Sequence, residues 1–254
     1  MTPLHIQAFG GVDDRGLHSV AGTRPWDAGQ SGPDEVRRDQ ILDKQYPAFG
    51  KLSLPDRLAF AASSIALAPG GTAPLAACGM CLASEYGSFS TDLRYQESIA
   101  AGFPSPAIFS STLPSSAISD VAIYYGIKGP NRVLCGPDAI VDVFACASRL
   151  IAHEKCACAL VIVLSAVEAQ DRQSPIARRP IAMTNSAWAF LLSGIGNDTL
   201  RISIAAEPGD ASAAAKADDV SLYSLARLCM QGAAGEIPLT TPQYRGRIII
   251  TKEI

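Results

Sequence analysis

The side chains that could act as nucleophiles or general bases include seven cysteines and three histidines. Cys135 stands out because Gly136, Pro137 and Asp138 follow it, and Pro and Asp favour the first positions of a helix. A thiol at a helix N-terminus has a lowered pKa and is a typical catalytic nucleophile. Our prediction ends a strand at Cys135 and begins the helix at Pro137, so we interpret Cys135 as a small apolar residue at a buried strand end.

The three histidines do not supply a base for this thiol. His5 and His18 lie near the start of the chain, and His153 lies at the end of the predicted helix, where its charge suits the helix dipole. Nucleophilic catalysis by cysteine needs a histidine within hydrogen-bonding distance. No Cys/His/His or Cys/His/Asn set can be assembled from these positions, and we expect no catalytic residues.

Four other cysteines have spacings that occur in metal and redox sites. Cys78 and Cys81 form a C-x-x-C pair, and Cys156 and Cys158 lie two residues apart. A structural zinc site needs four suitably spaced ligands, and side chains in a strand alternate between its two faces. We therefore predict that these cysteines pack in the core, and we expect neither a metal nor a cofactor.

The charged residues are weaker candidates for a functional site. We interpret Asp13-Asp14 and Asp218-Asp219 as solvated loop or helix-capping acids. The loop 172–180 carries Arg172, Arg178 and Arg179. We interpret this loop as solvated surface, with docking of an acidic carrier protein as the alternative.

The composition favours a soluble α/β protein of one domain, 1–254. The chain is 48% hydrophobic and 18% charged, which is enough for a large aliphatic core. Its net charge of −3 gives no reason to expect nucleic acid, and its scattered basic residues give none to expect a membrane surface. We see no signal peptide, no apolar run long enough to cross a bilayer and no disulfide framework, so we expect a cytoplasmic location.

The elements that must position these residues alternate between strands and helices, which predicts a sheet covered by helices on both faces. The clearest helix is 53–68, with Ser53 as its N-cap and Asp56 three residues later. Residues 10–50 are polar, and we predict a long excursion with one short helix. The other predicted helices are 92–101, 115–125, 137–154 and 218–233, and the predicted strands are 4–9, 74–84, 131–135, 157–168, 186–194, 199–206 and 246–254.

Several stretches between about 50 and 195 resemble the N-terminal half of a β-ketoacyl synthase, a member of the thiolase-like superfamily. They are AACGMCLASEYGSFSTDLRY (76–95), PSPAIFSSTLPSSAISDVAIYYGIKGP (104–130), VDVFACASRLIAHEKCACALVIVLSAVE (141–168) and SAWAFLLS (186–193). The sequence GIKGP alone would be a weak signal, but these pieces follow one another with family-like spacing. The resemblance implies a thiolase-like layered αβα fold.

The chain departs from active ketosynthases at the nucleophile. Their catalytic cysteine sits at the N-terminus of the central helix, and alignment from either side places Pro137 or Asp138 at this position. Neither residue can form a thioester. The two catalytic histidines of the family come from its C-terminal half, and the resemblance of this chain covers little beyond the N-terminal half.

The resemblance therefore implies a non-catalytic subunit. The chain is similar to short chain-length-factor proteins of aryl polyene and xanthomonadin-type pigment clusters. Such a subunit would form a heterodimer with a full-length β-ketoacyl synthase and meet acyl carrier protein through the complex. By resemblance, Phe103, Phe109 and Leu113 are candidates for guiding the acyl chain, with plain core packing as the alternative. The strand that would pair with the partner comprises Asn131, Arg132, Val133, Leu134 and Cys135.

Two other hypotheses remain open from the sequence. The first is a small independent acyltransferase or thioesterase that uses Cys135. The second is a scaffold that binds acyl carrier protein without taking part in chemistry.

Overall fold

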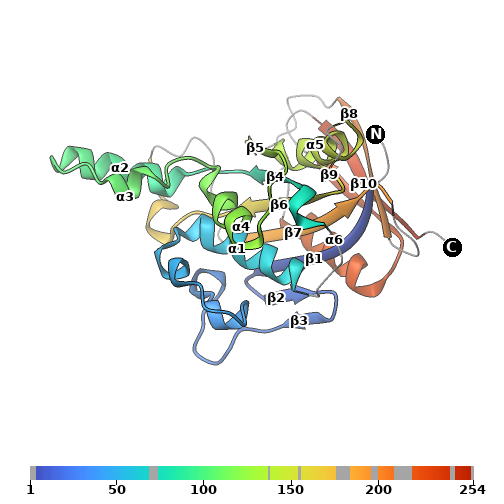
Figure 1. Ribbon diagram of the computed structural model, residues 1–254, viewed down its shortest axis with the longest axis horizontal. Helices are drawn as coiled ribbons and strands as arrows, with labels where there is room; N and C mark the ends of the chain where they lie inside the picture. Colours follow the sequence, from blue (N-terminus) through green and yellow to red (C-terminus); the bar gives the residue numbers. More distant parts are fainter. Residues whose placement is uncertain are drawn as a thin grey trace.

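The computed structural model describes residues 4–68, 74–136, 138–153, 156–175, 184–195, 200–208, 219–240 and 244–252. Its strands form one mixed sheet in the order β5-β4-β6-β7-β1-β8-β10-β9, and β2 and β3 extend from β1 as a hairpin (Figure 1). Strands β5, β4 and β6 are parallel, and the other pairings are antiparallel. The strands are β1 (Leu4–Asp13), β2 (Gly16–Ser19), β3 (Gly22–Arg24), β4 (Cys78–Ser84), β5 (Asn131–Cys135), β6 (Cys158–Ser165), β7 (Ser186–Ser193), β8 (Leu200–Pro208), β9 (Gly235–Thr240) and β10 (Tyr244–Lys252).

Helices cover both faces of this sheet, as the alternation of elements predicts. The α-helices are α1 (Leu54–Leu67), α2 (Phe89–Ala100), α3 (Pro106–Phe109), α4 (Ser116–Tyr125), α5 (Ala139–His153) and α6 (Asp219–Gln231). One core cluster joins α1 and α4 to one face of the sheet, and a second joins α5 and α6 to the other face. The predicted layered α/β fold is confirmed. Helices α2 and α3 extend away from the sheet (Figure 1).

The ends of two helices follow from local chemistry. The side chain of Ser53 accepts a hydrogen bond from the backbone N–H of Asp56, which caps α1 as predicted. Helix α4 ends at Gly126, whose φ of 67° lies in the left-handed region that glycine adopts without strain.

The polar excursion, 10–50, differs from the prediction. Strand β1 continues to Asp13, the hairpin β2–β3 follows, and three short 3₁₀ helices take the place of one short helix. These helices are η1 (Pro33–Glu35), η2 (Arg38–Gln40) and η3 (Pro47–Lys51). Each is closed by i→i+3 backbone bonds, and the scattered Gly and Pro residues prevent a longer helix from forming.

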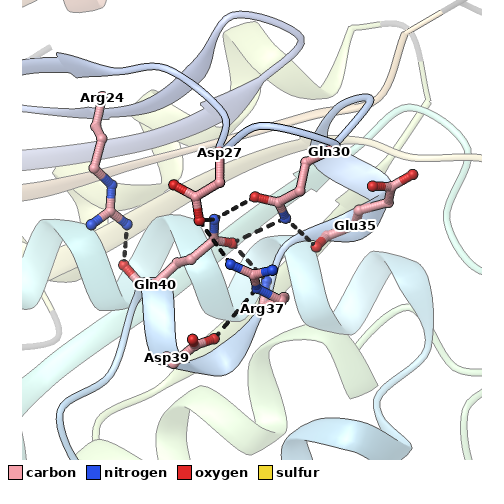
Figure 2. A network of polar contacts seen from close by, with 7 residues as sticks. All are labelled: Arg24, Asp27, Gln30, Glu35, Arg37, Asp39 and Gln40. Carbon is pink, nitrogen blue, oxygen red and sulfur yellow. Dashed lines mark hydrogen bonds and ion pairs between the residues drawn. The ribbon is translucent and has the colours of Figure 1, made fainter.

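Side-chain hydrogen bonds hold residues 24–40 of this excursion together (Figure 2). The carboxylate of Asp27 accepts from Arg37 at 2.7 Å and from Gln40 at 3.0 Å. Gln30 accepts from the amide of Gln40 at 2.6 Å and donates to the carbonyl oxygen of Glu35 at 2.8 Å. The segment thus keeps its shape through its own polar groups.

Asp34 connects the segment 10–50 to the rest of the fold through hydrogen bonds and an ion pair. Its carboxylate accepts from the side-chain amide of Asn185 at 2.7 Å, just before β7, and its carbonyl oxygen accepts from Arg57 of α1 at 3.1 Å. Its carboxylate also lies 3.8 Å from the guanidinium of Arg172. Arg172 is therefore part of an internal contact, which the sequence did not indicate, whereas Arg178 and Arg179 lie outside the described residues.

Candidate functional site

The start of α5 is where the sequence places the missing nucleophile. Helix α5 begins at Ala139, and the carbonyl oxygen of Asp138 accepts backbone hydrogen bonds from Val141 and Asp142. Asp138 thus has the position of a helix N-cap, for which Asp is well suited. Pro137 lies outside the described residues. Asp138, one of the two residues that the resemblance aligns with the ketosynthase nucleophile, thus lies at the start of α5.

Cys135 is the last residue of β5, as predicted, but it is exposed rather than buried. The prediction of a buried strand end is wrong because β5 is an end strand of the sheet. Partial desolvation raises the pKa of the Cys135 thiol, whereas a nucleophilic cysteine needs a lowered pKa.

The histidines lie far from Cys135. His5 and His18 belong to β1 and β2, and β1 is separated from β5 by β4, β6 and β7. His153 ends α5, whose 15 residues span roughly 22 Å from the end of the helix nearer Cys135. The geometry brings no imidazole to this thiol.

We therefore expect Cys135 to react slowly with iodoacetamide at neutral pH. A raised pKa leaves less thiolate than in a free cysteine, and the rate should still be increasing above pH 8.5, the usual pKa of a thiol. The measurement is the pH profile of Cys135 alkylation by peptide mapping, with glutathione as the reference. Faster alkylation of Cys135 than of glutathione at pH 7 would instead support the independent-enzyme hypothesis.

The four cysteines of the metal-like spacings are buried, so the prediction of core packing is confirmed. Cys78 and Cys158 belong to the cluster beneath α1 and α4, whereas Cys81 and Cys156 belong to the cluster beneath α5. The two thiols of the C-x-x-C pair therefore point to opposite faces of the sheet and cannot bind one ion together.

Strand β5 presents one side of its backbone outward. Met80 donates its backbone N–H to the carbonyl oxygen of Pro130, and Gly136 donates to the carbonyl oxygen of Ser84. A parallel ladder alternates, so residues 130, 132, 134 and 136 bond to β4. The N–H and C=O groups of Asn131, Val133 and Cys135 consequently point away from the sheet, where no strand of the described residues pairs with them.

Exposed apolar side chains gather in the segment that connects β4 to β5. The described residues include seven large exposed hydrophobic side chains, and five of them lie between residues 99 and 123. Phe103 is 83% exposed, Phe109 58% and Leu113 64%. The alternative of plain core packing for these three residues is therefore wrong. The apolar segment, as we call it, comprises Ile99, Phe103, Phe109, Leu113 and Ile123.

A pocket of about 350 Å³ lies beside Leu113. Asp56 and Asp120 line it, together with Ser110, Ser111, Ser115, Ser116 and Ser119. Asp56 accepts hydrogen bonds from Ser53 at 2.6 Å and Ser116 at 2.8 Å, and burial raises its pKa. These hydroxyl and carboxyl groups do not suit an alkyl chain, and the apolar part of the wall comes from Ala48, Leu52 and Leu113.

A different group of polar side chains was missed by the sequence analysis. His18 is fully buried, its Nε2 lies 2.7 Å from Asp13 Oδ1, and its Nδ1 lies 2.9 Å from Thr23 Oγ1. Asp13 is buried as well, so its interpretation as a solvated acid is wrong; Asp14 beside it is exposed. Of the other acidic pair, Asp219 begins α6 and Asp218 lies outside the described residues.

The fold positions this group through a glycine on the central strand. Gly11 of β1 pairs with Trp188 of β7 on one side and with His18 of β2 on the other. A Cβ at Gly11 would lie 2.3 Å from the Trp188 ring. Because glycine leaves this space open, Trp188 reaches across β1 and stacks on His18, with ring centroids 4.9 Å apart. The pairing of β2 with β3 then brings Thr23 beside His18.

No family model matches the chain, and no curated protein matches it. Solved structures do match. A chain of the complex of the ketosynthase ApeO with its chain length factor ApeC, from Xenorhabdus doucetiae, superposes with a TM-score of 0.72 at 15% identity, covering 98% of this chain and 100% of that chain. The chain has the ketosynthase fold.

Two further structures with the ketosynthase fold agree with this assignment. The ishigamide ketosynthase/chain length factor matches with a TM-score of 0.64 at 17% identity, over 91% of this chain and 74% of that chain. AntDE:AntF, a type II polyketide synthase acyl-carrier protein in complex with its ketosynthase bound to the hexaketide, matches with a TM-score of 0.66 at 8% identity, over 99% of both chains.

The described residues also bear on membrane association. None of their helices is both long and apolar enough to cross a bilayer.

Proposed function

We propose that the chain is a non-catalytic, chain-length-factor subunit that pairs with an active β-ketoacyl synthase and shapes its acyl tunnel. The product would belong to polyene or fatty-acid-type polyketide biosynthesis. The partner would hold the growing chain on its own cysteine and receive acyl units from acyl carrier protein.

The observation that carries this proposal is the end strand β5. Outward N–H and C=O groups on an end strand are a template for a strand of another chain. If the partner presents the corresponding strand about a pseudo-twofold axis, the two strands run antiparallel and the two sheets become one. The pairing strand would then be Asn131, Arg132, Val133, Leu134 and Cys135.

The apolar segment is a second observation in favour of a partner subunit. It connects β4 to β5 in sequence, and it leaves Phe103, Phe109 and Leu113 in contact with water in the isolated chain. Clustered exposed apolar side chains favour a protein interface. In the proposed complex these three residues would be covered by the partner and would limit the far end of its tunnel.

The start of α5 supports a non-catalytic role for this subunit. Asp138 occupies the N-cap, the thiol of Cys135 has a raised pKa, and the histidines lie elsewhere. The matched chain of the Xenorhabdus complex is covered completely, so its length is similar to that of this chain.

The test is the native mass of the chain expressed alone and with a full-length ketosynthase encoded next to it. We expect a stable one-to-one complex, and poor solubility of the lone chain, because β5 and the apolar segment would remain uncovered. A well-behaved monomer or homodimer that does not bind the ketosynthase would refute the proposal.

A further inference from the structure

The geometry points to a second site, at the β2–β3 hairpin, and we propose that Thr23 is an activated hydroxyl that accepts an acyl group from an activated ester or thioester. Three groups form a continuous chain there: the Asp13 carboxylate, the His18 imidazole and the Thr23 hydroxyl. A nucleophile bonded to a base that is itself oriented by a third group is the general arrangement of nucleophilic catalysis. This proposal does not depend on a partner subunit.

The proposed site uses one assignment of the two hydrogen bonds. As a carboxylate, Asp13 can only accept, so Nε2 of His18 carries the proton that it receives. In the tautomer that carries its proton on Nε2, Nδ1 can accept from the Thr23 hydroxyl, which lies 2.9 Å away. Asp13 also accepts from the backbone N–H of Arg15 at 2.8 Å, and the Arg15 guanidinium lies 3.8 Å away. Asp13 is therefore held in place as a positioning residue.

In the proposed site the base, His18, is buried, whereas the residue that carries the hydroxyl, Thr23, is exposed to solvent. The imidazole of His18 is covered completely and its plane is fixed by stacking on Trp188. Thr23 is exposed to solvent, and its hydroxyl can donate its proton either to His18 Nδ1 or, at 4.0 Å, to the sulfur of Met230 in α6. An acyl donor can thus approach Thr23 from solvent while the base remains shielded from it.

The proposed step is an acyl transfer. Thr23 Oγ1 attacks the carbonyl carbon as its proton passes to His18 Nδ1, and the imidazolium is stabilised by Asp13. The tetrahedral intermediate then collapses, the bond from carbon to the leaving oxygen or sulfur breaks, and His18 returns the proton to this atom. The products are acyl-Thr23 and an alcohol or thiol, and His18 is neutral again.

The test is acetylation of the full chain by p-nitrophenyl acetate, with the modified residues identified by peptide mapping. We expect Thr23 to be acetylated roughly 10²-fold faster than Ser19, because general-base assistance contributes about this factor or more. Ser19 is the matched reference, since it lies in the same hairpin and its hydroxyl donates to a carbonyl oxygen rather than to an imidazole. Acetylation of Thr23 no faster than that of Ser19 would overturn the proposal.

Four variants test whether Thr23 reacts because His18 activates its hydroxyl or only because Thr23 is exposed. Thr23→Ser should retain rapid acetylation, Thr23→Val should lose the modification at position 23, and Ser19→Ala should leave the Thr23 rate unchanged. His18→Phe keeps a ring against Trp188 but removes the base, so it should slow acetylation of Thr23 to the Ser19 rate. Rapid acetylation of Thr23 in His18→Phe would contradict the proposed role of His18. If this variant does not fold, the comparison of Thr23 with Ser19 in the unaltered chain still decides.

Discussion

Replacing Val133 by proline is expected to abolish the proposed heterodimer while leaving the subunit folded. The N–H of Val133 points away from β4, so proline at this position removes no hydrogen bond from the subunit's own sheet. Proline does remove the middle one of the three N–H groups of β5 that point away from the sheet, and its ring blocks the approach of a second strand. We expect affinity for the ketosynthase partner to fall about 10²-fold or more, since the bond lost with the N–H and a neighbouring bond blocked by the ring, at up to about 1.5 kcal/mol each, together correspond to this factor. The measurement is titration calorimetry or native mass.

Two matched variants complete this experiment. Val133→Thr has nearly the same shape and keeps the N–H, so it should bind almost as well as the unaltered chain. Leu134→Pro removes an N–H that bonds to β4, and it should destabilise the subunit itself. Unchanged partner affinity for a folded Val133→Pro variant would show that β5 is not the pairing strand.

Replacing His18 by phenylalanine is expected to destabilise the chain by about 3 kcal/mol. Phenylalanine preserves the stacking on Trp188 but removes the imidazole contact of Asp13 Oδ1, which keeps the hydrogen bond from the Arg15 backbone N–H. Asp13 is only 6% exposed, so its carboxylate would lose a hydrogen bond at a site that water hardly reaches. Urea unfolding followed by tryptophan fluorescence measures the change in unfolding free energy.

The double variant Asp13→Leu/His18→Phe tests the cause of this loss. If the cost comes from a buried carboxylate without its partner, removing both polar groups should recover at least about 1 kcal/mol relative to His18→Phe alone. The control is Asp14→Asn, at the exposed neighbouring residue, where we expect a change within about 0.5 kcal/mol. A double variant less stable than His18→Phe would mean that shape, not charge burial, dominates at this position.

Much of the fold could be predicted because the core elements carry strong local patterns. The helix at 53–68 had a cap, a capping partner and an apolar face, and the strand at 131–135 was bounded by Gly-Pro on both sides. Strand β9 was missed because Pro238 argues against a strand, and Pro is tolerated there because β9 is the other end strand of the sheet. The position of an end strand is a property of the whole sheet and cannot be deduced from the strand's own residues.

The candidate site was only partly predictable for the same reason. The carboxylate at the start of α5 follows from the order of residues, since Asp138 is the second residue of the predicted helix, 137–154. The contact of Asp13 with His18 and Thr23 depends instead on how β1, β2 and β3 pair, and the stacking of Trp188 on His18 joins residues 170 positions apart. The sequence did contain one usable signal, the glycine at position 11, whose meaning appears only once β7 is placed beside it.

The place of β1 in the sheet also has a consequence for synthesis of the chain. Strand β1 is made first among the strands but pairs with β7 and β8, whose residues begin at 186 and 200. At a translation rate of 5–20 residues per second, the ribosome needs roughly 10 to 35 s after the end of β1 to reach β7 and β8. The parallel strands β4, β5 and β6 can assemble with α5 during this interval, whereas β1 can join them only after β7 has been made. This high contact order predicts slow folding, and a demand on chaperones that bind β1 until β7 emerges from the ribosome.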